Sequence, residues 1–125
     1  VHQWVGESDF GAGRIWRLRS RVRSEALPLM QQMAQVLAPL GVAWTDDAEA
    51  NQASPGPDAG VLMRRHQWPA VELSQDGTNY FDVHHSANDT LDRVDLKTLP
   101  QNVAAWAVTA WLAAQAPVGF GPLPK

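Results

Sequence analysis

The residues best suited to chemistry lie in one polar stretch, residues 80–95, which reads YFDVHHSANDTLDRVD. It contains two adjacent histidines and four aspartates, together with an asparagine, a serine and a threonine. Imidazole and carboxylate groups are the usual protein ligands of zinc and similar ions. The stretch is too polar for a core strand. We therefore expect a loop that joins a strand to a helix, where functional side chains are commonly held on a rigid scaffold.

A second cluster of carboxylates follows the first apolar segment. Residues 1–6 have the composition of a short strand, and the residues after them read ESDFGAG, beginning at Glu7. In open α/β sheets, ligands bind beyond the carboxyl ends of the strands, so this glycine-rich turn is well placed for a site. A solvated turn with a helix-capping aspartate is the alternative, because turns commonly use these residue types.

Length and composition restrict the class of protein. The chain has 125 residues, enough for one domain with a real core. The net charge of -3 argues against bulk attraction to nucleic acid. The absence of cysteine excludes disulfides and thiolate metal sites. No apolar run is long enough for a membrane span, and the first residues do not resemble a signal peptide. A start at Val1 indicates a piece of a longer protein.

Apolar periodicity predicts the helices that would position these clusters. Residues 24–40 and 95–115 have apolar side chains at three- and four-residue spacing. Residues 58–66 suit a short helix, with Asp58 able to cap its first turn as Ser24 could cap the earlier helix. The last helix is expected to pack on a sheet through Val103, Trp106, Ala107, Ala110, Trp111 and Ala114.

Extended segments are expected at residues 1–6, 14–23, 42–44 and 68–73. Helical and extended segments therefore alternate, which indicates an α/β protein with a mainly parallel or mixed sheet. The four arginines at alternate positions from Arg17 to Arg23 could form an anion-binding or nucleic-acid stripe. A charged edge strand is favoured, because no aromatic platform accompanies them. Residues 1–116 are expected to form one domain part, and the Pro/Gly-rich residues 117–125 a tail.

The order of these motifs resembles the C-terminal part of metallopeptidase family twenty-eight, a family of two-zinc exopeptidases. GESDFGAG comes first, followed by GPDAGVLMRRHQWPAVEL, YFDVHHSANDTLDRVD and QNVAAWAVTAWLAA. The resemblance covers nearly the whole chain and is strongest to the carboxypeptidase Q-like branch and its bacterial aminopeptidase relatives. It implies the C-terminal portion of a three-layer α/β/α zinc exopeptidase fold with a mixed, mainly parallel sheet.

The resemblance also implies which residues bind metal. In that family the Asp of the ESD element binds one zinc, and the His directly before the Ser binds the other; here these are Asp9 and His85. Asp89 lies four residues after His85, a spacing that suits a carboxylate holding the other imidazole nitrogen. Capping of Thr90 is an equal alternative for Asp89.

Three further residues are candidates beside the metals or in a substrate pocket. His84 competes with His85, and adjacent side chains on an extended segment point in opposite directions, so only one should face the metals. Glu7 could brace the metal-binding aspartate or be a solvated carboxylate. Tyr80 could line a substrate pocket or be an ordinary buried aromatic residue.

The remainder of the family's site is missing from this chain. The other zinc ligands of the family are a His, a bridging Asp and a Glu, and its general base is a second Glu. The sequence has no His-x-Asp pair and no Glu-Glu pair. Asp9 and His85 would belong to different ions. We therefore expect an inactive fragment that the missing N-terminal portion of the same domain completes, with short peptides as substrates and two zinc ions as cofactors.

The sequence also allows a second hypothesis for the function. A non-catalytic binding or interaction module that keeps the peptidase fold is the alternative to the incomplete enzyme. The residues do not distinguish aminopeptidase, carboxypeptidase and dipeptidase action. The family resemblance implies a secreted or periplasmic protein, and no nucleic-acid partner or membrane span is expected.

Overall fold

The computed structural model describes residues 2–123 of the chain. Two regular strands, β1 (Ile15–Arg21) and β2 (Ala70–Gln75), form an antiparallel ladder. Leu18 pairs with Leu73 in this ladder, and both side chains are buried. Side chains alternate between the two faces of a strand, so this pair marks the face that enters the main core.

Two other extended segments flank the ladder through single parallel bridges. Val5 bridges to Ala70 in β2, and Ala43 bridges to Arg17 in β1. The predicted strands at residues 1–6 and 42–44 are thus reduced to isolated bridges. A mainly parallel sheet is not confirmed within residues 2–123, because the regular ladder there is antiparallel.

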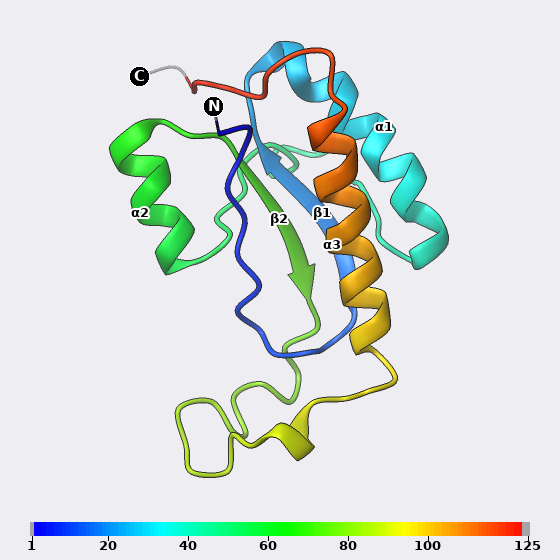
Figure 1. Cartoon of the computed structure of the whole chain (residues 1–125), viewed down its shortest axis with the longest axis vertical. Helices are drawn as coiled ribbons and strands as arrows, with labels where there is room; N and C mark the ends of the chain where they lie inside the picture. Colours follow the sequence, from blue (N-terminus) through cyan, green and yellow to red (C-terminus); the bar gives the residue numbers. More distant parts are fainter. Residues whose placement is uncertain (1, 124–125) are drawn as a thin grey trace.

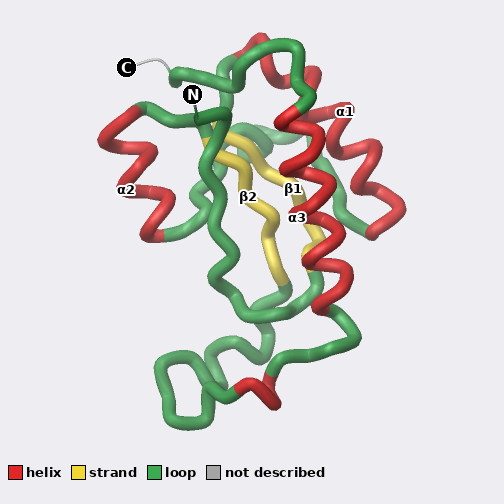
Figure 2. Tube along the Cα trace, viewed as in Figure 1, coloured by secondary structure: helices red, strands yellow, loops and turns green. Residues whose placement is uncertain are grey.

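The helices cover both faces of the ladder. Helices α1 (Leu27–Leu37) and α3 (Leu99–Ala114) lie against each other on the side of β1 (Figure 1). Helix α2 (Pro57–His66) lies apart from them (Figure 2). Short 3-10 turns occupy Ser24–Ala26, Ala38–Leu40 and Leu91–Arg93. The predicted helix at residues 24–40 is therefore one α-helix with a tighter turn at each end.

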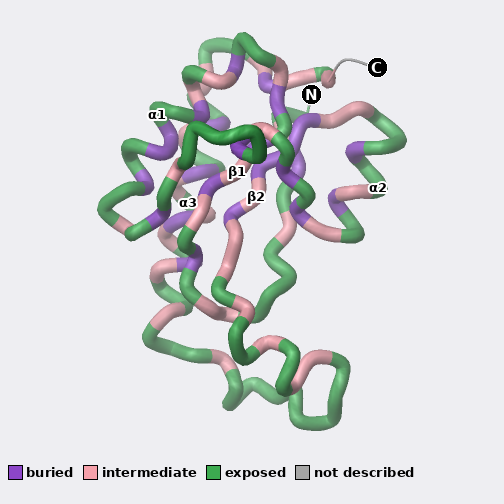
Figure 3. Tube along the Cα trace, turned by 180° about the vertical axis from the view of Figure 1, so that it is seen from behind, coloured by how far each residue is buried: buried purple, intermediate pink, exposed green. Residues whose placement is uncertain are grey.

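Two clusters of buried side chains show that the helical layers lie on opposite faces. Val71 enters the main core with residues of β1, α1 and α3. Its neighbour Ala70 enters a smaller cluster with Val5 and with Ala59 and Met63 of α2. Adjacent residues of a strand point to opposite faces, so the ladder is sandwiched between two layers (Figure 3). The α/β class is confirmed.

The buried face of α3 differs from the predicted one. Asn102, Ala105, Thr109 and Ala113 are buried, whereas Trp111 is 67% exposed. No residue of α3 is charged, so both sides of the helix are largely apolar. The three- and four-residue spacing of apolar side chains predicted as buried the side that the structure mostly exposes. The two polar side chains can point inward because both are hydrogen-bonded there.

The arginines of β1 do not protect an open edge. Ser20 of β1 exchanges backbone hydrogen bonds with Ala50 and Ala53, so the following loop runs along the outer side of the strand. Arg17 lies 2.8 Å from Asp47 in that loop, and its side chain is mostly buried. Arg17 and Arg19 therefore act as partners of an acidic loop, which lies where the charged edge was predicted.

Helix ends follow the sequence only in part. Gly41 ends the first helical segment with a left-handed φ of 78°, as a glycine at this position suggests. Neither Ser24 nor Asp58 caps its helix through a side-chain hydrogen bond. The first turns of both helices therefore take their partners from other parts of the chain or from solvent.

The C-terminal segment has no regular element up to residue 123, but it is packed. Phe120 is buried in the main core, and its carbonyl oxygen accepts a hydrogen bond from the Arg23 backbone at 3.0 Å. The division between residues 1–116 and 117–125 stays a prediction. Among the described helices, none is long and apolar enough to cross a membrane.

Candidate functional site

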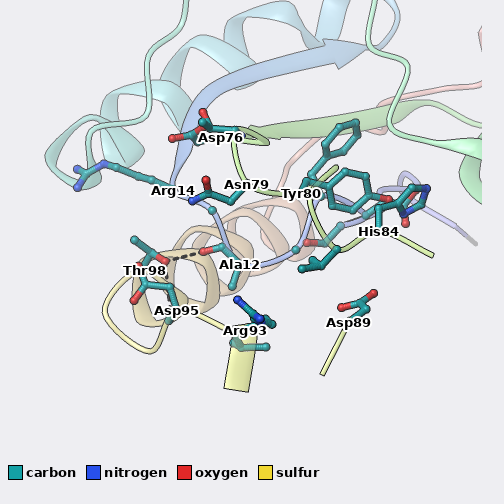
Figure 4. Close-up of a pocket in the computed structure, with 18 of the residues that line it drawn as sticks. Ala12, Arg14, Asp76, Asn79, Tyr80, His84, Asp89, Arg93, Asp95 and Thr98 are labelled. Atoms are coloured by element: carbon teal, nitrogen blue, oxygen red, sulfur yellow. Dashed lines mark hydrogen bonds between the residues drawn. The ribbon is translucent and has the colours of Figure 1, made fainter. Parts of the chain in front are cut away.

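Two loops meet beyond the end of the ladder and line a cavity of about 560 Å³. Residues 8–14 supply one wall, and residues 76–98 supply most of the other (Figure 4). The second loop extends away from the core and is largely exposed (Figure 3). The polar stretch 80–95 is thus the predicted loop between a strand and a helix.

Glycine at position 13 allows the two walls to approach each other. A Cβ atom on Gly13 would lie 1.8 Å from the Asp76 carbonyl oxygen, which no side chain tolerates. The close approach lets the Asp76 backbone N–H donate to the Arg14 carbonyl at 2.8 Å. Gly11, with φ of 71°, forms the turn just before. The glycine-rich motif is therefore a structural requirement of the cavity.

Side chains from β2 and from the start of α3 fix the first loop through three successive carbonyl oxygens. The bonds run from Gln75 Nε2 to Gly11 O (2.8 Å), from Thr98 Oγ1 to Ala12 O (2.6 Å) and from Asn102 Nδ2 to Gly13 O (3.0 Å). Sequence analysis missed these anchors. An asparagine within an otherwise apolar helix was the available signal, since a buried amide needs partners.

Five of the six predicted site residues line this one cavity: Asp9, Tyr80, His84, His85 and Asp89. Asp9 is exposed, and its carboxylate forms no hydrogen bond within residues 2–123. The tertiary structure therefore brings the two chemical clusters of the sequence together, and it leaves the Asp9 carboxylate available to a ligand.

The two adjacent histidines both line the cavity, but the extended backbone expected for this segment is wrong; which histidine would face a metal ion stays a prediction. His85 has a left-handed φ of 55°, so the segment turns here and is not extended. The two rings stack with their centroids 3.7 Å apart. His84 in turn stacks on Tyr80 at 4.5 Å. Left-handed backbone at a non-glycine residue is uncommon and often marks a functional position.

Tyr80 faces carboxylates from both loops. Burial raises the pKa of its hydroxyl, and the negative charges of Asp9 and Asp89 raise this pKa further. The phenol therefore stays protonated at neutral pH and can act as a hydrogen-bond donor in the cavity. Phe10 packs against its ring at 4.8 Å.

Asp89 does not cap the turn that follows it. The Thr90 hydroxyl donates instead to the carboxylate of Asp92. This bond is the main reason that the pKa of Asp92 is lowered. The Asp89 carboxylate is thus left facing the cavity, as a role beside a metal-binding imidazole requires. That role itself stays a prediction.

Glu7 lies outside the cavity. Its Oε2 atom accepts a hydrogen bond from the Ala59 backbone N–H at 2.9 Å, in the first turn of α2. The carboxylate also packs so closely on Gly56 that a Cβ atom there would overlap it. Glu7 therefore satisfies the helix N-terminus that Asp58 was expected to cap, and a carboxylate is favourable at that end of a helix.

The donor atoms suit a zinc ion in kind but not in number. Imidazole nitrogen and carboxylate oxygen are common zinc ligands, and both types face the cavity. Across residues 2–123, however, no group of three or more such side chains is arranged to hold a metal ion. A complete site with Asp9 and His85 would need ligands from outside these residues.

Comparison with known proteins places this fold unit within longer peptidases. No protein-family model matches the chain. Carboxypeptidase Q of Rattus norvegicus is 31% identical over 111 residues, and the Homo sapiens protein is 29% identical over 111 residues. The crystal structure of a peptidase M28 precursor from Shewanella amazonensis SB2B superposes with a TM-score of 0.86 and 45% sequence identity.

The matches cover most of this chain but a small share of each relative. The chain matches over 88% of its own length with the two carboxypeptidase Q proteins and spans 22% of theirs. It matches over 99% with the Shewanella amazonensis protein and spans 27% of that chain. The fold unit described above therefore occurs in those proteins as one part of a larger whole.

Proposed function

This chain corresponds to part of a metallopeptidase of family M28, and we propose that it forms the C-terminal part of a zinc-dependent exopeptidase domain. The complete domain would hydrolyse terminal peptide bonds of short peptides. The observation that carries the proposal is that Asp9 and His85, far apart in sequence, line one cavity. The family resemblance assigns zinc binding to these same two residues.

Four residues of the cavity have a role in this proposal. Asp9 and His85 each supply one ligand to a different zinc ion, and Asp89 orients the imidazole of His85. Tyr80 donates a hydrogen bond to the bound peptide. When bound, the zinc ions supply Lewis acidity at the scissile carbonyl group. The general base and the other ligands come from a portion that the longer relatives have, so this chain alone is inactive.

The cellular location and the type of terminus belong to the same proposal. We expect a secreted or periplasmic protein, in line with the family resemblance. The names of the similar proteins favour carboxypeptidase action, but aminopeptidase and dipeptidase action use the same metal chemistry. A panel of dipeptides and of peptides blocked at either end would distinguish these activities in the complete protein.

A hybrid protein tests the proposal. In this hybrid, the matched segment of the Shewanella amazonensis protein is replaced by this chain. We expect weak zinc binding and no hydrolysis by the isolated chain, and two bound zinc ions and dipeptide hydrolysis by the hybrid. Asp9→Ala and His85→Ala should each remove one ion from the hybrid and abolish hydrolysis.

Matched controls separate metal binding from general damage. Asp46→Ala and His66→Ala change exposed residues of the same types outside the cavity and should leave both ions in place. Asp89→Ala should weaken zinc binding by roughly 10–100-fold. Calorimetry that finds two tightly bound ions in the isolated chain, or both ions in the Asp9→Ala hybrid, would show that the ligand assignment is wrong.

A further inference from the structure

A second cavity, of about 550 Å³, lies at the opposite end of the ladder from the candidate site. Arg14 lines the first cavity just before β1 begins, and Arg21 lines the second where β1 ends. A strand rises about 3.3 Å per residue, so the backbones of these two arginines lie roughly 20 Å apart. Figure 1 shows α2 and the C-terminal segment, which supply further walls of the second cavity, far from residues 76–98. The second cavity is therefore separate from the candidate metal site.

The charged side chains of the second cavity are all positive. Arg21 and Arg64 line it, and no aspartate or glutamate of residues 2–123 does. Neither guanidinium group forms an ion pair within this part of the chain. Arg17 and Arg19, on the same strand as Arg21, have carboxylate partners at 2.8 Å and 3.4 Å. In a chain with a net charge of -3, two arginines without carboxylate partners in one cavity are suited to an anionic ligand.

Gly60 makes room in α2 for one of these guanidinium groups. A Cβ atom at this position would lie 3.2 Å from Nη1 of Arg64, which is tighter than an ordinary contact. The arginine side chain therefore folds back over the glycine, and both residues line the cavity. Glycine inside a helix is destabilising relative to alanine, so its presence here needs a reason. Space for the guanidinium group beside the cavity is such a reason.

Hydrogen bonds fix the walls of the second cavity. The Asn51 side chain accepts from the Ser20 hydroxyl at 2.8 Å and from the Val22 N–H at 2.9 Å, and it donates to Val22 O at 2.9 Å. These bonds hold the loop against the end of β1. The Leu123 N–H donates to Gln67 O at 3.0 Å, which holds the C-terminal segment against the end of α2. The cavity is thus preformed, and a preformed site loses less conformational freedom when a ligand binds.

The rest of the lining includes apolar side chains. Val22, Ala53 and Met63 are buried residues of this wall, and Leu123 is half-buried. Sites for small molecules typically measure roughly 300–1,000 Å³ and combine an apolar wall with a few charged groups. The second cavity has this size and this composition.

We propose that the second cavity binds an organic phosphate. The phosphate group lies between Arg21 and Arg64, and the organic part lies against Met63 and Leu123. A guanidinium group presents a planar fork of N–H donors that matches two phosphate oxygens. Two such groups balance the charge of nearly -2 that a phosphate monoester carries at neutral pH. This site depends neither on zinc binding nor on hydrolysis, so it can be tested separately from the proposed function.

Calorimetric titration of phenyl phosphate into this chain, at low ionic strength and pH 7.5, tests the proposal. We expect a Kd below about 1 mM, and a weaker Kd would overturn the proposal. Arg21→Ala and Arg64→Ala should each weaken binding at least roughly 10-fold, because each removes charge-assisted hydrogen bonds. Both residues are exposed, so each variant should keep its Tm within about 2 °C.

Two control variants separate this cavity from other positive charges. Arg65→Ala removes an exposed arginine that neighbours Arg64 in α2 but does not line the cavity. Arg93→Ala removes an arginine of the first cavity. Each should change the Kd by less than about 2-fold. An effect of Arg65→Ala equal to that of Arg64→Ala would reduce the binding to general charge attraction, and loss of binding in Arg93→Ala would place the ligand in the first cavity. Either result would refute the proposal.

A third variant and two further probes test the shape of the site. Gly60→Leu keeps both charges and raises helix propensity, but it fills the space beside Arg64 and should weaken binding at least roughly 10-fold. Unchanged affinity in this variant would show that the ligand does not enter the cavity. Inorganic phosphate, which lacks the organic part, and phenylacetate, which carries a single charge, should both bind at least roughly 5-fold more weakly than phenyl phosphate. Equal binding of either probe would refute the assignment to an organic phosphate.

Discussion

Asn102 is the buried side chain that ties the cavity to helix α3, and its replacement by leucine tests this directly. Only 5% of the residue is exposed. Its Nδ2 atom donates to Gly13 O at 3.0 Å and to Thr98 O at 3.2 Å, and its Oδ1 atom accepts from Gln75 Nε2 at 2.6 Å. Leucine has nearly the same shape as asparagine and removes these three bonds together with a longer one to Gln101 Oε1 (3.4 Å).

The cost follows from the groups that would lose a partner. The Gly13 carbonyl would lose its bond from Asn102, and the Nε2 atom of Gln75 would keep only its bond to Gly11 O. A buried polar group left unpaired costs about 1–3 kcal/mol. We therefore expect Asn102→Leu to lower the free energy of unfolding by about 2–3 kcal/mol. Small domains lose about 1–3 kcal/mol per molar urea, so the urea midpoint should fall by roughly 1–2 M.

Urea unfolding followed by tryptophan fluorescence measures this change. Gln32→Leu is the matched control, because it makes the same kind of replacement at an exposed position of α1. The control should change stability by no more than about 0.5 kcal/mol. If Asn102→Leu falls within the same limit, the three bonds do not anchor the loop, and our account of how Asp9 is positioned is wrong.

Three further predictions concern the charged groups. Tyr80 is the single tyrosine of the chain, so the absorbance of tyrosinate reports its pKa, which should lie above the ordinary value. Asp9→Asn should lower the pKa of Tyr80, because it removes a negative charge from the cavity, and Asp46→Asn should leave it unchanged. Equal effects of the two substitutions would contradict the shared cavity. Glu7→Ala should destabilise the chain by about 1 kcal/mol in urea unfolding, because α2 loses the acceptor at its N-terminus, and Asp46→Ala should have no comparable effect. A hydrogen bond from the Thr45 side chain is the main cause that lowers the pKa of Asp47. The ionised Asp47 therefore stabilises the fold above its unfolded pKa of about 3.9, and this stabilisation is lost as the pH falls through the lower folded pKa. The difference in urea midpoint between wild type and Asp47→Asn should therefore narrow below about pH 4, and a constant difference would contradict the assignment.

Local sequence was sufficient for the features that depend on nearby residues. The loop at residues 80–95 follows from its polarity, and the end of the first helical segment follows from Gly41. The alternation of helical and extended segments predicted the α/β class, and the order of the motifs carried the family resemblance. These features depend on backbone preference and on spacing along the chain, which one sequence displays directly.

The face that α3 buries could not be predicted from the sequence. The helix lacks charged residues, so both of its sides are apolar and periodicity has no polar side to exclude. Asn102 lies on the buried side, where Gly13 and Gln75 are its partners. The Thr109 hydroxyl can be buried because it donates to Ala105 O of the same helix. Of the face expected to form the core, Trp106 does pack against the main core, whereas the other members are exposed: Val103, Ala107, Ala110, Trp111 and Ala114.

The arrangement of the cavity was also decided by tertiary contacts. Asp9 and His85 were predicted as candidates by type and resemblance, but only the packing of two distant loops places them in one cavity. The left-handed backbone at His85 turns both histidines the same way, and the partner of Glu7 lies in α2. Sequence determines which groups can do chemistry and where chains turn. Which groups meet depends on long-range hydrogen bonds and close backbone approaches, and spacing along the chain does not encode these.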